Sequence, residues 1–157
     1  MFFISKFKNE GELMESNDNH YITFGADIGD VNAGKAVGPH LSELRKLIYR
    51  FCDKIYCEEI DEIAPILRVD GDLAYWEFEG CEKLRLSKKY RYITIDVGMP
   101  RSRWEGLNGI EIKNYLIDNL KEALELMVKR LKKEKYKVNE NELWTDFAKV
   151  EGEFLFN

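Results

Sequence analysis

A glycine-rich stretch near the start of the chain has residue types that bind phosphate in many nucleotide-binding proteins. Gly29, Gly34 and Lys35 have the spacing of the Gly-x4-Gly-Lys-[Ser/Thr] motif, in which backbone amides and the lysine hold phosphates. The neighbouring patterns predict a strand before it and a helix after it, as the motif requires. However, Ala36 lacks the hydroxyl group that would bind magnesium. A small nucleotide- or metal-dependent enzyme using Gly29 to Lys35 is one hypothesis, and a loop without a ligand is the other.

The other reactive side chains form no recognisable catalytic set. His20 and His40 are the only histidines, which is too few for a histidine-rich metal cluster. They could hold a metal only together with carboxylates such as Asp27 or Asp30. No Ser-His-Asp or Cys-His arrangement has support in the sequence. We therefore expect no catalytic residues, no metal and no cofactor.

Acidic side chains are concentrated in the middle of the chain. The net charge is -5, and between Asp53 and Glu82 only Lys54 and Arg68 oppose the acids. A negative protein repels phosphates, which argues against nonspecific binding of nucleic acid. If the acids share one face, they would steer a basic protein partner toward it. The alternative is a set of solvated surface charges.

The stretch from Arg101 to Gly106 contains two arginines and a tryptophan between the expected strand and helix. Arginine and tryptophan are enriched among residues that dominate protein interfaces, so Arg103 and Trp104 are candidates for partner contact. Equally, Trp104 could fold inward over the start of the helix. We favour the inward position, because an exposed large aromatic side chain lowers solubility.

A strand and a long helix organise the rest of the chain. From Tyr90 to Val97, apolar residues alternate with polar ones, which predicts a strand with one buried face. Asn108 and Glu111 have the spacing of a capping box at a helix start. Apolar residues then recur every three or four positions from Ile112 to Leu131, which predicts an amphipathic helix.

Further elements are expected on both sides of this unit. Tyr21 to Ile28 is a strand candidate, and a second amphipathic helix is expected from Pro39 to Ile63. Asp70-Gly71-Asp72 predicts a hairpin between strands at 66–69 and 73–78. The tail is expected to form a short helix over 139–147 and an extended segment over 150–156. The chain of 157 residues then forms a single α+β domain over 1–157, a mainly antiparallel sheet packed against two long amphipathic helices.

The cysteines and the apolar segments predict a cytoplasmic protein. Cys52, Cys57 and Cys81 are an odd number without zinc-type spacing, which favours reduced thiols in the core. No apolar run approaches the ~18 residues that cross a bilayer, and the first residues are charged too early for a signal peptide. We expect no membrane partner.

As a whole, the chain resembles the immunity proteins of bacterial polymorphic-toxin and contact-dependent inhibition systems. The likeness lies in the 92–98 strand, which leads through Trp104-Glu105-Gly106 into the 112–131 helix, together with the acidic middle. The resemblance implies a small acidic α+β protein without catalytic residues that binds and neutralises a cognate toxin domain, often a basic nuclease. The expected toxin-binding residues are Asp70, Asp72, Tyr75, Glu77, Glu79, Arg103 and Trp104.

Overall fold

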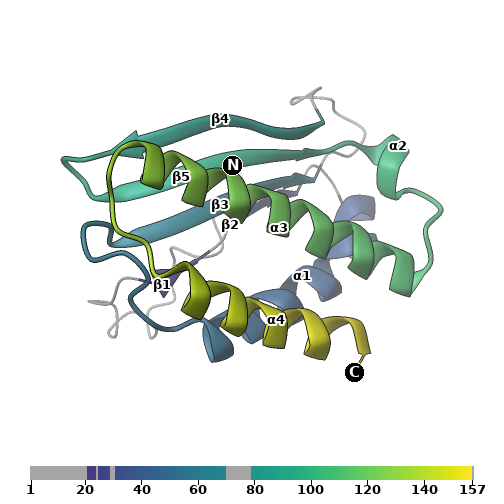
Figure 1. Ribbon diagram of the computed structural model, residues 1–157. Coiled ribbons are helices and arrows are strands. Elements are labelled where there is room, and N and C mark those ends of the chain that lie inside the picture. Colours follow the sequence, from purple (N-terminus) through teal and green to yellow (C-terminus); the bar gives the residue numbers. More distant parts are fainter. Residues whose placement is uncertain (1–20, 24, 29–30, 70–78, 157) are drawn as a thin grey trace.

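A mixed β-sheet and three long helices form the fold in this computed structural model (Figure 1). The structure describes residues 21–23, 25–28, 31–69 and 79–156. The strands lie in the order β1-β3-β5-β4, and β2 also pairs with β3. Their bounds are Tyr21–Ile22 for β1, Gly25–Ile28 for β2, Glu62–Val69 for β3, Gly80–Ser87 for β4 and Tyr92–Met99 for β5. The expected α+β class is confirmed.

The sheet is mostly parallel, which corrects the expectation of a mainly antiparallel sheet. β1, β2 and β5 all run parallel to β3, and only β4 runs antiparallel to its neighbour β5. A parallel pair needs a long crossover, and the helix α1 (Val31–Phe51) supplies it between β2 and β3. A strand followed by a helix occurs twice, as β2 with α1 and as β5 with α3 (Gly109–Lys133). Strands that alternate with helices in this way favour parallel pairing between the strands.

The expected hairpin between 66–69 and 73–78 is wrong. β2 pairs with Ile66–Val69 on one edge of β3, while β5 pairs with the same residues on the other edge. A strand has only two hydrogen-bonding edges, so no third strand can join Ile66–Val69. Residues 70–78, including the Asp70-Gly71-Asp72 turn signal, lie outside the described residues.

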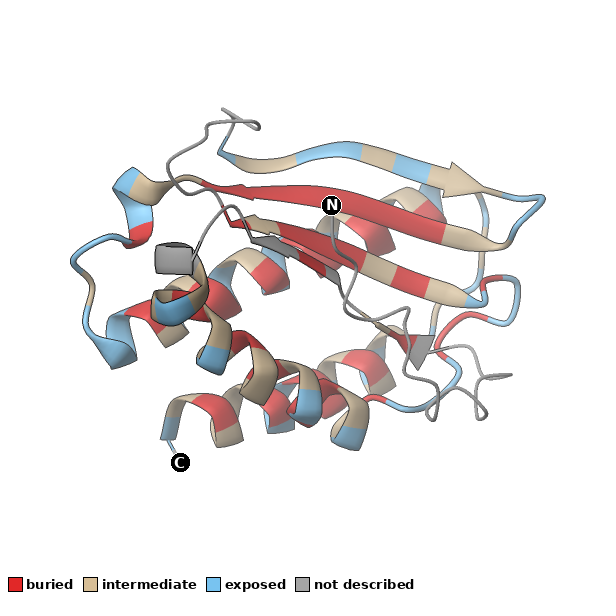
Figure 2. Cartoon of the chain, turned by 180° about the vertical axis from the view of Figure 1, so that it is seen from behind, coloured by how far each residue is buried: buried red, intermediate tan, exposed pale blue. Residues whose placement is uncertain are grey.

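The core lies between the sheet and its helices. Ile93, Ile95, Val97 and Met99 project from one face of β5 and are almost fully buried, as their alternation predicts. Thr94 and Asp96 on the opposite face are buried as well, which corrects the expectation of a single buried face. The helix α3 (Gly109–Lys133) crosses this face, in front of the strands in Figure 1 and behind them in Figure 2. The buried positions in Figure 2 follow the central strands and the inner sides of the helices.

The capping box at the start of α3 is confirmed in full. The Asn108 side chain accepts a hydrogen bond from the Glu111 amide, and the Glu111 carboxylate accepts one from the Asn108 amide, both at 2.9 Å. These two bonds satisfy amide groups that have no partner within the helix. α3 then extends two residues beyond the predicted end at Leu131.

The C-terminal tail is one helix, so the expected extended segment over 150–156 is wrong. The helix α4 (Glu140–Phe156) packs against α1 and α3, with Val150 and Phe154 fully buried. Leu143, Phe147, Val150 and Phe154 recur at intervals of three or four residues, which is a helical period. The period therefore continues through the segment assigned as extended.

The first long helix lies further toward the N-terminus than the expected span from Pro39 to Ile63. α1 covers Val31–Phe51 and contains Pro39 in its interior. Because α1 ends at Phe51, Ile55 lies beyond the helix, and its side chain is 43% exposed.

An irregularity interrupts the edge strand β4. The register of β4 on β5 shifts between Glu82 and Arg85, where an extra residue is accommodated. Lys83 lies at this point with a φ of 57°, in the left-handed region that side chains with a Cβ rarely adopt. The bulge therefore breaks the regular ladder in the middle of β4.

Candidate functional site

The glycine-rich stretch does not form a phosphate-binding loop in the described residues. β2 ends at Ile28 and α1 begins at Val31, so Gly34 and Lys35 lie inside the first turns of the helix. A phosphate site at this position needs a loop whose amides are free to point at the ligand. Within a helix, the Lys35 amide instead bonds to a carbonyl four residues earlier. Gly29 and Asp30 lie outside the described residues.

The histidine-based metal alternative has little support from geometry. His40 lies half-buried on α1, where burial and then the charge of Lys113 lower its pKa, while Glu43 raises it. His20 and Asp30 lie outside the described residues. Across the residues that the structure describes, no group of three or more histidine, cysteine or carboxylate side chains could hold a metal ion.

The sheet separates the central acidic residues into two groups. Glu62 begins β3 beside Tyr92, whereas Val69 ends it beside Met99, and Gly80 pairs with Gly98 at that second end. At about 3.3 Å per residue, the two ends of β3 are roughly 23 Å apart. The acids of the 53–62 segment therefore lie at one end of the sheet, and Glu79 lies at the other.

The first acidic group has basic neighbours. Asp61 pairs with Arg91 at 3.0 Å, and Arg91 also donates a 2.7 Å hydrogen bond to the Glu58 carbonyl. A hollow of about 310 Å³ opens beside it, lined by Ile55, Tyr56, Glu58, Lys137, Val138 and Asn139. The local charge is mixed, so this end of the sheet is not a purely acidic surface.

Glu79, at the second end of the sheet, and Arg103 beside it are the two described members of the expected toxin-binding set that reach the surface. Glu79 pairs with Arg103 at 2.6 Å, and both side chains are about half exposed, at 50% and 58%. Burial, and then the charge of Glu79, raise the pKa of the nearby Tyr115 to about 12, although Arg103 opposes this. Among the residues that the structure describes, none forms a hydrogen bond with the buried Tyr115 hydroxyl. Asp70, Asp72, Tyr75 and Glu77 lie outside the described residues.

Trp104 is buried, as the inward position predicts. The short helix α2 (Arg101–Trp104) places it at 3% exposure, and its indole donates a 3.1 Å hydrogen bond to the Met99 carbonyl. Trp104 therefore covers the end of β5 and cannot contact a partner in this conformation.

Two buried carboxylates have cationic partners. Asp96 pairs with Arg68 at 3.4 Å and Arg85 at 4.0 Å. Asp146 accepts a 2.6 Å hydrogen bond from the Tyr56 hydroxyl and pairs with Lys54 at 3.1 Å. Because each has a cationic partner, the cost of burying the charge is offset.

Burial raises the pKa values of all three cysteine thiols. Burial raises the pKa of Cys52 to about 12, and the pKa values of Cys57 and Cys81 to about 11. All three are free, in agreement with the expected reduced state. A thiol with a raised pKa carries little of the nucleophilic thiolate near neutral pH.

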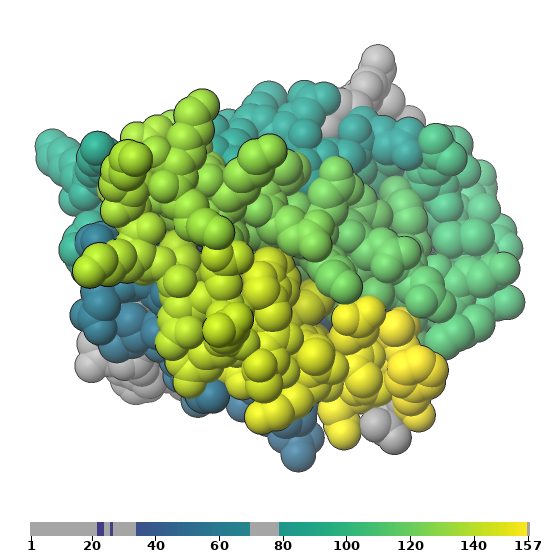
Figure 3. Space-filling view, in the orientation of Figure 1, coloured from purple at the N-terminus to yellow at the C-terminus, as the bar shows by residue number. Residues whose placement is uncertain are grey.

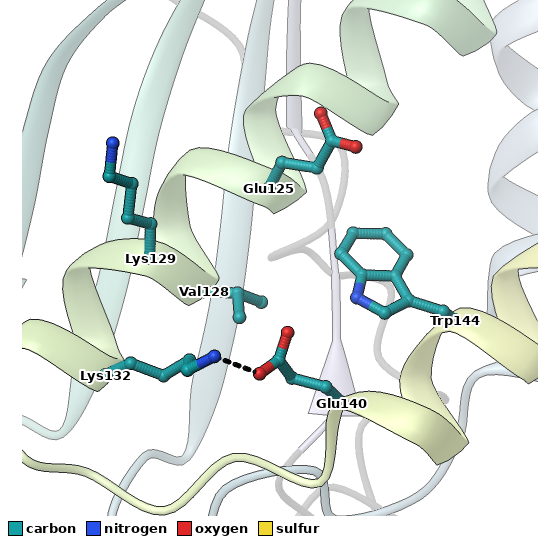
Figure 4. Close-up of a pocket in the computed structure, with 6 residues that line it drawn as sticks. All are labelled: Glu125, Val128, Lys129, Lys132, Glu140 and Trp144. Atoms are coloured by element: carbon teal, nitrogen blue, oxygen red, sulfur yellow. Dashed lines mark ion pairs between the residues drawn. The ribbon is translucent and has the colours of Figure 1, made fainter.

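A second hollow lies between α3 and α4, which together cover one face of the molecule (Figure 3). Its volume is about 330 Å³. Figure 4 shows Trp144 between the carboxylates of Glu125 and Glu140, and Lys132 binds Glu140 at 2.5 Å. The remaining lining residues are Val128 and Lys129.

Comparison with known families decides what kind of protein this is. The model of the family named immunity protein 44 matches residues 20–153. The chain belongs to the immunity protein 44 family. Searches of curated proteins and of solved structures found no significant match. The resemblance to immunity proteins noted from the sequence is thereby confirmed.

Among the described residues, no helix is long and apolar enough to cross a membrane. The sequence did not single out Glu125, Glu140 or Trp144, which meet in the hollow between α3 and α4. Trp144 is partly buried and packs against the core. The antiparallel packing of α3 and α4 brings these residues together, and sequence spacing carries no signal of it.

Proposed function

We propose that this chain is a non-catalytic cytoplasmic immunity protein that binds and neutralises a cognate toxin domain. The observation that carries the proposal is the match of the immunity protein 44 family to residues 20–153, which spans the whole described sheet, α1, α3 and most of α4.

The proposed contact surface is the acidic segment between β3 and β4. Val69 and Gly80 lie at the same end of the sheet, so both attachment points of this segment are there. Its sequence adds Asp70, Asp72 and Glu77 to the exposed Glu79, with Tyr75 among them and Arg103 at its edge. Acidic residues so close together in the sequence favour a basic toxin domain, such as a nuclease, and would raise its association rate by electrostatic steering.

The function is tested by co-expressing the chain with the product of the gene immediately upstream, followed by affinity capture and mass spectrometry. We expect a stoichiometric complex with a C-terminal toxin domain, and growth protection of cells that express that domain. Cells that die from the domain despite abundant immunity protein, with no complex recovered, would contradict this partner.

The surface is tested by a pair of charge-matched variants. One carries Asp70→Asn, Asp72→Asn, Glu77→Gln and Glu79→Gln, and the other carries Asp53→Asn, Asp61→Asn, Glu58→Gln and Glu59→Gln. Each removes two aspartates and two glutamates, the first from the segment between β3 and β4 and the second from the segment between α1 and β3. We expect only the first to slow association with the toxin domain and to flatten its salt dependence. Equal effects would show that net charge, and not this surface, governs binding.

A further inference from the structure

The hollow between α3 and α4 combines an aromatic wall with carboxylates on either side. Trp144 is only partly buried, and Glu125 and Glu140 flank its ring in Figure 4. Val128 closes the hollow from α3, while Lys129 extends away from the indole. An aromatic ring attracts a cation over its face, and the carboxylates add a second attraction for the same charge.

One cation already pairs with a carboxylate of the hollow, on the side away from Trp144 in Figure 4. The Lys132 ammonium group pairs with Glu140 at 2.5 Å across the gap between the two helices. Its side chain is 56% exposed, whereas that of Glu140 is 34% exposed, so the lysine can turn into solvent more readily than the glutamate. No ion pair of Glu125 is found within the described part of the chain, which leaves one carboxylate of the hollow available.

We propose that this hollow binds an arginine side chain of a partner protein, with the guanidinium stacked on Trp144 between Glu125 and Glu140. A planar guanidinium can stack on an indole while it donates hydrogen bonds to carboxylates at its edges, which an ammonium group cannot do equally well. The incoming arginine displaces Lys132 from Glu140. That this partner is the toxin domain rests on the proposed function, whereas the preference for arginine follows from the hollow itself.

The preference is tested without the toxin, by NMR titration of the full 15N-labelled chain with a blocked Gly-Arg-Gly tripeptide. The indole N–H signal of Trp144 is identified by its loss in Trp144→Phe. We expect this signal to move and saturate in the millimolar range with the arginine peptide, to move less with Gly-Lys-Gly, and to stay in place with the uncharged citrulline analogue.

Variants identify the groups responsible. Glu125→Gln and Glu140→Gln should each weaken peptide binding by about 1.5- to 5-fold, the range of an exposed ion pair. Glu122→Gln removes the same charge from α3 outside the hollow and should leave binding unchanged. Lys132→Ala should tighten binding by a similar factor because it removes the competing cation, whereas Lys133→Ala should not.

Two results would overturn the proposal. One is an equal response to the citrulline peptide, and the other is an equal loss of binding in Glu122→Gln and Glu125→Gln. The toxin capture experiment is independent of both. A toxin complex that forms while the peptide fails to bind would remove the arginine site and leave the proposed function intact. A chain that binds the peptide but captures no toxin would keep the arginine site and contradict the proposed function.

Discussion

The hydroxyl of Tyr56 donates a 2.6 Å hydrogen bond to the carboxylate of Asp146, which lies ninety residues later in the chain. Both side chains are buried, and Lys54 adds an ion pair to the same carboxylate at 3.1 Å. The Asn139 amide also donates a 2.8 Å hydrogen bond to the Tyr56 carbonyl. The segment after α1 is thereby fastened to the start of α4.

Tyr56→Phe should therefore destabilise the fold. The change leaves a buried carboxylate oxygen without its closest donor, and a hydrogen bond to a charged group contributes about 1.5–3 kcal/mol. We expect a loss of that size in the free energy of unfolding, measured by urea denaturation at pH 7. Tyr90→Phe, at a side chain that is 66% exposed, is the matched control and should change stability by less than about 0.5 kcal/mol.

Removal of the helix cap should have a smaller cost. Asn108→Ala deletes the side chain that accepts from the Glu111 amide, and N-cap losses typically cost about 1 kcal/mol. Urea denaturation should show this loss with an unchanged m-value. Asn141→Ala, on the exposed side of α4, provides the comparison, and an equal loss there would mean that the cap contributes nothing specific.

The buried thiols and phenols should make the fold sensitive to alkaline pH. The pKa values of Cys52, Cys57 and Cys81 rise from 9.0 to about 12, 11 and 11, so these groups keep their protons longer in the folded state. Above about pH 9 the unfolded chain releases protons that the folded chain retains, so stability falls as pH rises.

Each such group contributes a limiting slope of about 1.4 kcal/mol per pH unit. Urea midpoints measured in reducing buffer between pH 7 and 11 should decrease, and Cys81→Ser should make the decrease shallower. A stability profile that stays flat to pH 11 would contradict the burial of these groups.

Nucleotides should have no effect on the chain. Gly34 and Lys35 lie within α1, so we expect no heat on titration with ATP or GTP and no rise in melting temperature. Lys35→Ala should behave as the parent chain does in both assays. Nucleotide-dependent heat that disappears in Lys35→Ala would restore the nucleotide-dependent alternative.

Local patterns in the sequence predicted the elements with the strongest physical signals. The alternation before Gly98 and the capping box at Asn108 involve residues that are neighbours in the chain, so their chemistry can be read directly. The inward position of Trp104 followed from the cost of exposing it. These three features lie in one strand-loop-helix unit, which is also where the family resemblance was strongest.

The errors came from pairings between distant segments. Asp-Gly at 71 indicates a tight turn, but which strand lies beside Ile66–Val69 depends on β2 and β5, which come from elsewhere in the chain. Pro39 was taken as a helix start because its missing amide is tolerated there. It lies in the interior of α1, whose buried Leu41, Leu44 and Ile48 supply tertiary packing that outweighs the local preference.

The irregular β4 limits how this protein can meet other proteins. Among the described residues, β4 pairs only with β5, so its outer side would otherwise be a template for a strand from another chain. The shift between Glu82 and Arg85 and the turned backbone at Lys83 remove the regular spacing that such a strand needs. A second copy therefore cannot extend the sheet into a continuous ribbon along the whole of β4. The outer side of β4 therefore presents an interrupted backbone ladder, at the shift between Glu82 and Arg85, to any protein that approaches it.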